Sequence, residues 1–123
     1  MLQKWRHVRR CHKLAGSCTQ PALSAYLEAC SELKIGRINN TPLISVDLEM
    51  TGLDKGSNHI IAIGWTLIDA GRIQLGSNRH LLINADQTVG ASAAIHELLD
   101  SEVAQGESLE FGLEQLFEAA QGR

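Results

Sequence analysis

Acidic residues are absent from the first 27 positions of this 123-residue sequence, and Glu28 is the first of 14. Residues 1–40 hold seven basic and two acidic residues, a net charge of +5, whereas residues 41–123 hold four basic and 12 acidic residues, a net charge of −8. A basic arm of this kind is suited to contact phosphates, and the alternative is a solvated terminus. An Arg-rich, acid-poor start is also typical of a mitochondrial transit peptide, and that alternative stays open.

The sequence also lacks an apolar run long enough to span a membrane or to form the core of a secretory signal. We therefore expect a cytoplasmic protein with no membrane partner. Cysteine is confined to Cys11, Cys18 and Cys30, and an odd number without a secretory signal predicts reduced thiols. A zinc site formed by these residues with His12 is the alternative, although their spacing contains no pair separated by two residues.

The length and the 44% apolar content predict a single core rather than two. We divide the chain into a basic helical N-terminal arm at residues 1–41 and an α/β domain at residues 42–123. In the arm, the apolar spacing predicts helices over 1–14 and 21–34, with a break between them. We expect Trp5 of the first helix to pack against the domain, and the alternative is that it stacks on a nucleic-acid base.

A short aliphatic run from Leu43 to Leu48 follows Pro42 and ends before Thr51-Gly52, which predicts a buried strand. Side chains alternate across a strand, so Asp47 and Glu49 project from the same face. Two neighbouring carboxylates repel each other, and a divalent cation between them removes that repulsion. Oxygen ligands favour Mg²⁺ or Mn²⁺, whereas the alternative interpretation is a solvated turn without a ligand.

The next apolar run, residues 60–68, is apolar on both faces and predicts a central strand that is covered on both sides. Asp69 to Arg72 predicts a tight turn. The strand returns over 73–83 with a bulge at 76–78. The short connections make the three strands an antiparallel meander.

Two helices are expected after the strands. The first covers residues 92–104, where His96 and Asp100 lie one turn apart and could share a metal or a proton; the alternative is an exposed pair. The last helix begins after a cap at Ser108 and ends near Ala120, with an apolar stripe along it.

The segment D-x-E-x-T-G-L at 47–53, preceded by a strand and followed by a loop and the apolar run 60–64, resembles the first motif of the DEDD (DnaQ-like) 3′–5′ exonucleases. This family includes the proofreading subunit of bacterial DNA polymerase III, oligoribonuclease and ribonuclease T. The resemblance covers residues 43–122. It implies a ribonuclease H-like exonuclease fold of the α/β class, of which the N-terminal half is a three-stranded antiparallel meander with flanking helices.

The same resemblance implies that Asp47 and Glu49 are catalytic and hold a pair of Mg²⁺ or Mn²⁺ ions, which activate a water and stabilise the leaving 3′ oxygen. It implies that Thr51, Gly52 and Leu53 approach the terminal nucleotide, and that His96 lies at the edge of the nucleotide pocket. The expected substrates are single-stranded 3′ ends of DNA or RNA, with a DNA polymerase subunit as a further partner.

The family uses four acidic ligands from three motifs, and this sequence contains only the first pair. The second and third motifs would follow Arg123. We therefore expect the front half of an exonuclease domain, with weak metal binding and no turnover. One alternative is a non-catalytic module that binds nucleic acid or a polymerase through the basic arm. Another is a structural protein whose acidic pair is simply exposed.

Overall fold

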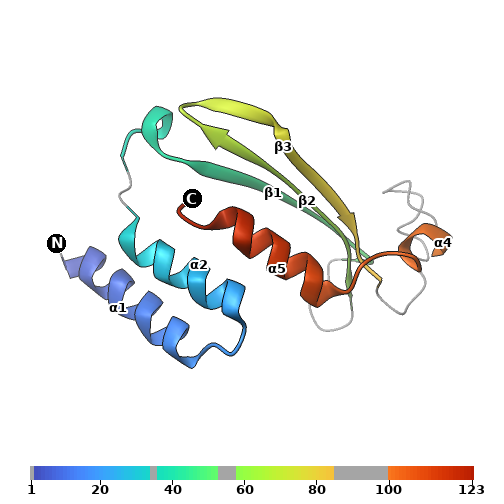
Figure 1. The fold of residues 1–123 in the computed structure, drawn as a ribbon, viewed down its shortest axis with the longest axis horizontal. Helices are drawn as coiled ribbons and strands as arrows, with labels where there is room; N and C mark the ends of the chain where they lie inside the picture. The colour runs from blue at the N-terminus through green and yellow to red at the C-terminus, as the bar shows by residue number, and fades with distance from the viewer. Residues whose placement is uncertain (1, 34–35, 53–57, 85–99) are drawn as a thin grey trace. The chain divides into compact units, whose positions relative to one another are not determined.

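The computed structural model describes residues 2–33, 36–52, 58–84 and 100–123, and they form a mixed arrangement of helices and strands (Figure 1). This confirms the α/β class, whereas the ribonuclease H-like assignment stays a prediction. Contacts divide the chain into two compact units. The first comprises 1–44, 67–74 and 114–123, and the second comprises 45–66 and 75–113. The N-terminal arm thus belongs to the first unit.

The arm is a pair of helices, α1 (Leu2–Ser17) and α2 (Pro21–Glu32), which lie side by side (Figure 1). Both predicted helices are confirmed, but α1 continues through the expected break at Gly16. Side-chain hydroxyls stabilise its end, because Ser17 Oγ donates to Leu14 O at 3.0 Å and Ser24 Oγ donates to Ala15 O at 3.2 Å. A 3₁₀ turn at Ile38–Asn40 then leads into the sheet.

The buried side of α1 differs from the predicted one. Cys11 and Ala15 are 6% and 5% exposed, whereas Trp5 is 57% exposed. The helix presents its small residues at i and i+4 where α2 approaches, and Trp5 lies on another side of the helix. The expectation that Trp5 packs against the domain was therefore wrong.

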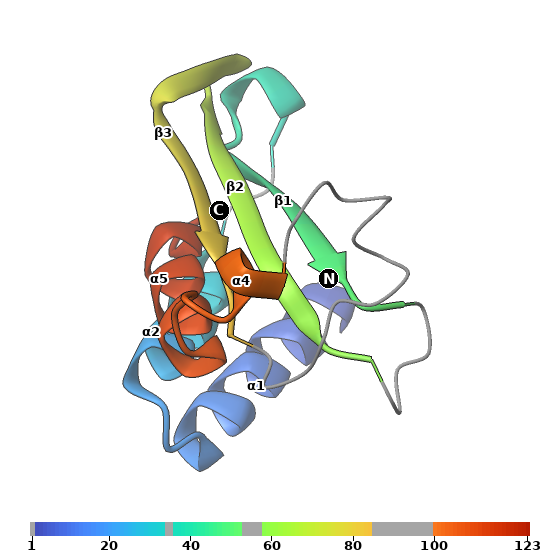
Figure 2. The ribbon, with the colours of Figure 1, turned by 90° about the vertical axis from the view of Figure 1, so that its right-hand side faces the viewer.

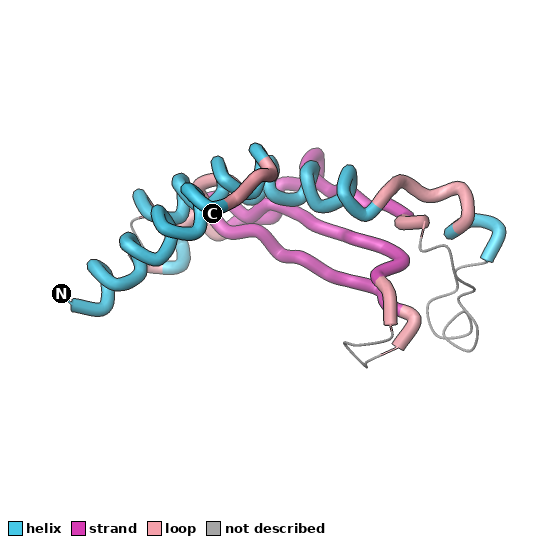
Figure 3. Tube along the Cα trace, turned by 90° about the horizontal axis from the view of Figure 1, so that it is seen from below, coloured by secondary structure: helices cyan, strands magenta, loops and turns pink. Residues whose placement is uncertain are grey.

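The sheet has the order β1-β2-β3, and its strands run antiparallel as predicted (Figure 2). The strands are β1 (Leu43–Met50), β2 (Ile60–Asp69) and β3 (Arg72–Leu82), and Figure 3 shows them side by side. In β2, Ile61 and Ile63 are fully buried and Ala62 on the other face is 1% exposed. The central position of this strand is confirmed, and both of its faces are covered over these three residues.

A two-residue turn joins β2 to β3. Ala70 and Gly71 both have positive φ, 51° and 71°, which is the backbone of a type I′ hairpin. Gly71 adopts the left-handed region readily because it has no Cβ, whereas Ala70 adopts it although the region disfavours most side chains. The predicted tight turn is confirmed.

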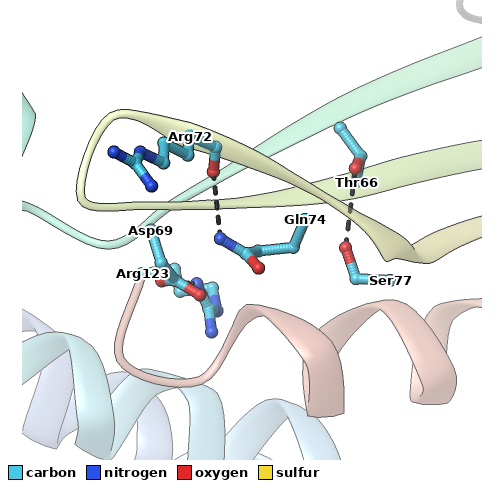
Figure 4. Close-up of polar contacts among 6 residues, drawn as sticks. All are labelled: Thr66, Asp69, Arg72, Gln74, Ser77 and Arg123. Atoms are coloured by element: carbon cyan, nitrogen blue, oxygen red, sulfur yellow. Dashed lines mark hydrogen bonds and ion pairs between the residues drawn. The ribbon is translucent and has the colours of Figure 1, made fainter.

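The register of β3 confirms the predicted bulge. A regular hairpin closed at Ala70-Gly71 would place Thr66 opposite Leu75. Instead Thr66 Oγ1 donates to Asn78 Oδ1 at 2.5 Å. The Thr66 hydroxyl also lies 3.5 Å from Ser77 Oγ (Figure 4). The strand β3 therefore contains extra residues before Asn78, as a bulge requires.

The end of β3 pairs with the segment that precedes the last helix. Ile83 and Glu107 form a parallel bridge, in which Glu107 N donates to Leu82 O and Asn84 N donates to Glu107 O, both at 2.8 Å. The chain passes so close at Gly106 that a Cβ there would lie 2.7 Å from Leu82 C and O. Glycine is required at this position because the neighbouring atoms are backbone.

The last helix, α5 (Leu109–Ala120), begins as predicted, because Phe111 N donates to Ser108 Oγ at 3.2 Å. Within the second unit, Gly112 of α5 packs against Ile63 and Ile83. Within the first unit, the centre of the Phe117 ring lies 5.4 Å from the centre of the Tyr26 ring.

Of the helix expected over 92–104, the structure describes α4 (Asp100–Val103). Residues 92–99 lie outside the described ranges. In the ranges that the structure describes, no helix is both long and apolar enough to cross a membrane.

Candidate functional site

The candidate acidic pair lies on β1, at an edge of the sheet that the described residues form. Asp47 is exposed and Glu49 is half-buried, at same-face positions of the strand. On the other face, Val46 and Leu48 are 43% and 42% exposed. The prediction of a buried strand was therefore wrong for the middle of β1, since an edge strand has a neighbour on one side and less cover than β2.

Because Asp47 is exposed, the repulsion between the Asp47 and Glu49 carboxylates is weakened by solvent. Two positions along a strand separate the Cα atoms of Asp47 and Glu49 by about 7 Å. At that separation, two full charges in water repel by about 0.6 kcal/mol. The exposed Asp47 carboxylate keeps its hydration, so the fold tolerates the pair without a cation. The same exposure leaves Asp47 accessible to a hydrated divalent ion.

The residues immediately beyond the pair are fixed by hydrogen bonds across the base of the loop. Thr51 N donates to His59 O and His59 N donates to Thr51 Oγ1, both at 3.0 Å. Thr51 Oγ1 in turn donates to Asn58 Oδ1 at 3.2 Å. A Cβ on Gly52 would lie 2.7 Å from the same Asn58 oxygen, so Gly52 allows Asn58 this position. Thr51 and Gly52 therefore have defined positions next to Glu49.

Asn58 and His59 were not among the predicted site residues. The sequence placed Asn58 in the loop that separates residues 47–53 from the apolar run at 60–64. Only the hydrogen bonds to Thr51 reveal that both residues position the end of β1. The predicted site residues Leu53 and His96 lie outside the described residues.

The ligand set for a metal is partial. Asp47 and Glu49 are oxygen donors on one face of one strand, which fits part of the coordination of Mg²⁺ or Mn²⁺. Within the described part of the chain, no group of three or more His, Cys, Asp or Glu side chains is placed to hold an ion.

The cysteines of the arm are free thiols. Cys11 and Cys30 are buried in the helix pair and Cys18 is half-buried. His7 Nε2 lies 3.3 Å from Cys30 O and 3.6 Å from Cys11 Sγ, which are hydrogen-bonding contacts between and along the two helices. The zinc site considered from the sequence is not found among the described residues.

Comparison with protein-family models found no family that matches the chain, and comparison with curated proteins found no match either.

Proposed function

We propose that β1 supplies two metal-binding carboxylates to a 3′–5′ exonuclease site, with Asp47 and Glu49 as ligands of Mg²⁺ or Mn²⁺. One observation supports it most: the two acidic residues occupy same-face positions of an exposed edge strand, directly before the segment Thr51-Gly52 that Asn58 and His59 hold in place. The resemblance of 47–53 to the first DEDD motif supports the same assignment.

Each residue has a distinct proposed role. When bound, a divalent ion supplies a water nucleophile of lowered pKa and stabilises charge at the scissile phosphate. Asp47 is the more accessible ligand because it is exposed, whereas the half-buried Glu49 has less rotational freedom. We assign Thr51 and Gly52, which follow Glu49 and are held by Asn58 and His59, as the segment against which a terminal nucleotide would lie. The proposed substrates are single-stranded 3′ ends of DNA or RNA.

We expect the exonuclease activity of this chain to be weak. Two carboxylates are half of the four acidic ligands that the resembled family uses, and Mg²⁺ releases its own waters reluctantly. We therefore expect the 123-residue chain to bind Mn²⁺ weakly and to turn over little or no substrate.

Mn²⁺ binding, followed by electron paramagnetic resonance of the free ion, tests the ligand assignment. The double variant Asp47→Asn/Glu49→Gln should lose binding. The matched control Glu110→Gln/Glu114→Gln removes two exposed carboxylates spaced one turn apart on α5 and should retain binding. Equal Mn²⁺ binding by both double variants would overturn the assignment.

A 5′-labelled single-stranded oligonucleotide tests the reaction. If the parent chain shortens the oligonucleotide from its 3′ end, and if both a chelator and the Asp47→Ala variant abolish this shortening, the nuclease chemistry is supported. The same result would disprove the expectation of little turnover. Cleavage that persists in Asp47→Asn/Glu49→Gln would contradict the proposal.

A further inference from the structure

Four cationic side chains form one face of α1. Arg6, Arg9, Arg10 and Lys13 follow the spacing i, i+3, i+4, i+7, and all four are exposed. At 100° per residue this spacing confines them to about a third of the circumference of the helix. We call these four residues the basic face.

The other side of α1 is already occupied. Cys11 and Ala15 are buried and Val8 is half-buried, in the helix that packs along α2. The helix is therefore amphipathic in a fixed orientation, with its apolar side used in the fold and its basic face in solvent.

Trp5 extends the basic face with an exposed aromatic ring. The Arg9 guanidinium lies 4.6 Å from the centre of the Trp5 ring, yet Trp5 remains 57% exposed. Trp5, Arg6, His7, Arg9 and Arg10 line a solvent-open hollow of about 620 Å³ on this helix. The exposed Trp5 ring thus lies beside the positive charges of the neighbouring arginines.

The clustered positive charges of the basic face lower the stability of α1 as a helix. Like charges at i, i+4 destabilise a helix by about 0.2–0.5 kcal/mol per pair, and both Arg6–Arg10 and Arg9–Lys13 have that spacing. No acidic residue occurs within Leu2–Ser17 to offset the repulsion. A bound polyanion would remove it.

We propose that the basic face and Trp5 bind single-stranded nucleic acid, with the cations on backbone phosphates and the Trp5 ring stacked on a base. The charge of the face favours a polyanion. Insertion into a membrane needs a continuous free apolar face. The small apolar residues Cys11 and Ala15 of α1 are buried, and its exposed apolar residues Trp5 and Leu14 lie on opposite sides of the helix. An acidic protein would satisfy the charges but would leave the exposed ring without a stacking partner. The inference does not depend on the proposed nuclease function, because it requires neither a metal nor a 3′ end.

Fluorescence anisotropy of a labelled single-stranded oligonucleotide, measured with the full chain in chelator over a range of salt concentrations, tests the proposal. Four phosphate contacts predict that log K falls with log salt with a slope of about −3. In Arg6→Gln/Arg10→Gln the slope should become shallower by about 1.4 and the affinity at low salt should fall about tenfold or more. Circular dichroism confirms that the helices remain, since Gln also favours helix.

The matched control removes the same charge elsewhere. Arg37→Gln/Arg72→Gln changes two exposed arginines outside α1 and should leave both the slope and the affinity within about twofold of the parent chain. Equal losses in the two double variants would show non-specific attraction to net charge and would overturn the proposal. Asp47→Asn/Glu49→Gln should bind as the parent does, which separates this inference from the nuclease proposal.

Tryptophan fluorescence tests the stacking. Trp65 is 8% exposed, so quenching by the oligonucleotide reports on Trp5 and should disappear in Trp5→Phe. Absence of quenching in the parent chain would contradict the stacked base. Anionic phosphatidylserine vesicles and polyglutamate serve as competitors: binding of either that exceeds oligonucleotide binding and is lost in Arg6→Gln/Arg10→Gln would overturn the choice of nucleic acid.

Discussion

Arg123 Nη1 lies 2.6 Å from Asp69 Oδ1, which joins the chain three residues after α5 to the end of β2 (Figure 4). The Arg123 side chain is 19% exposed and the Asp69 side chain is 43% exposed. The pair connects positions 54 residues apart in sequence, at the hairpin end of the sheet. Because one partner is well exposed, the interaction is screened by solvent and is worth less than a buried ion pair.

Replacement of Asp69 tests this contact. Asp69→Asn should lower the free energy of unfolding by about 0.5–1 kcal/mol at low salt, and by less at high salt because ions screen the pair. Urea denaturation at two salt concentrations measures the difference. Glu114→Gln, a change of the same charge on α5, is the control and should have a smaller effect without the salt dependence.

Gly106 should not tolerate a side chain. The Cβ of Gly106→Ala would meet Leu82 C and O at 2.7 Å, and these backbone atoms belong to the end of β3. We expect a loss of about 1–3 kcal/mol in unfolding free energy. The control Gly76→Ala adds the same methyl where no atom lies within 4 Å, and it should be near neutral. Thermal denaturation of the two variants compares them, and similar melting temperatures would contradict the close approach.

The pKa of the Tyr26 hydroxyl is raised above its ordinary value of 10.0, chiefly by its hydrogen bond to Cys30, then by burial and by electrostatic interaction with Cys30 and Cys11. Tyr26 is the single tyrosine, so the ultraviolet absorbance of its phenolate follows its titration alone. We expect a midpoint above 10.0 in the folded chain, and a midpoint closer to 10.0 in Cys30→Ala or in denaturant. Identical midpoints in all three would disprove the shift.

The same shift predicts the direction of the pH dependence of stability. A folded-state pKa above the unfolded one means that the folded chain holds the proton more tightly. The contribution of Tyr26 is therefore complete below pH 10 and is lost as the pH rises through the raised pKa. Urea denaturation should show a smaller decline over this alkaline range in Tyr26→Phe than in the parent chain.

The three thiols should react at different rates. Cys11 and Cys30 are 6% and 9% exposed, whereas Cys18 is half-buried in the connection between α1 and α2. A thiol reagent needs access to the sulfur, so one fast and two slow thiols are expected under native conditions. The fast phase should disappear in Cys18→Ser, and its persistence there would show that the helix pair opens readily.

Local chemistry predicted several elements well. The Ser108 hydroxyl caps α5, Pro21 begins α2, and Ala70-Gly71 forms the turn, because each depends on residues that are close in sequence. The bulge before Asn78 was also predicted, from glycine and polar residues interrupting an apolar run. The candidate site was predicted in part: Asp47 and Glu49 share a face of β1, but the loop residues Asn58 and His59 were missed.

Sequence alone determined where the strands and helices begin and which residues alternate along them, since these properties follow from backbone preferences and short-range hydrogen bonds. Only the tertiary structure decided which of these residues are covered. In the folded chain Cys11 and Ala15 are buried, whereas Trp5 is exposed. The middle of β1 is also exposed, and Thr51 is held by hydrogen bonds to Asn58 and His59. Burial depends on which other segment packs against a side chain, and such pairings between distant segments are not encoded in any local pattern.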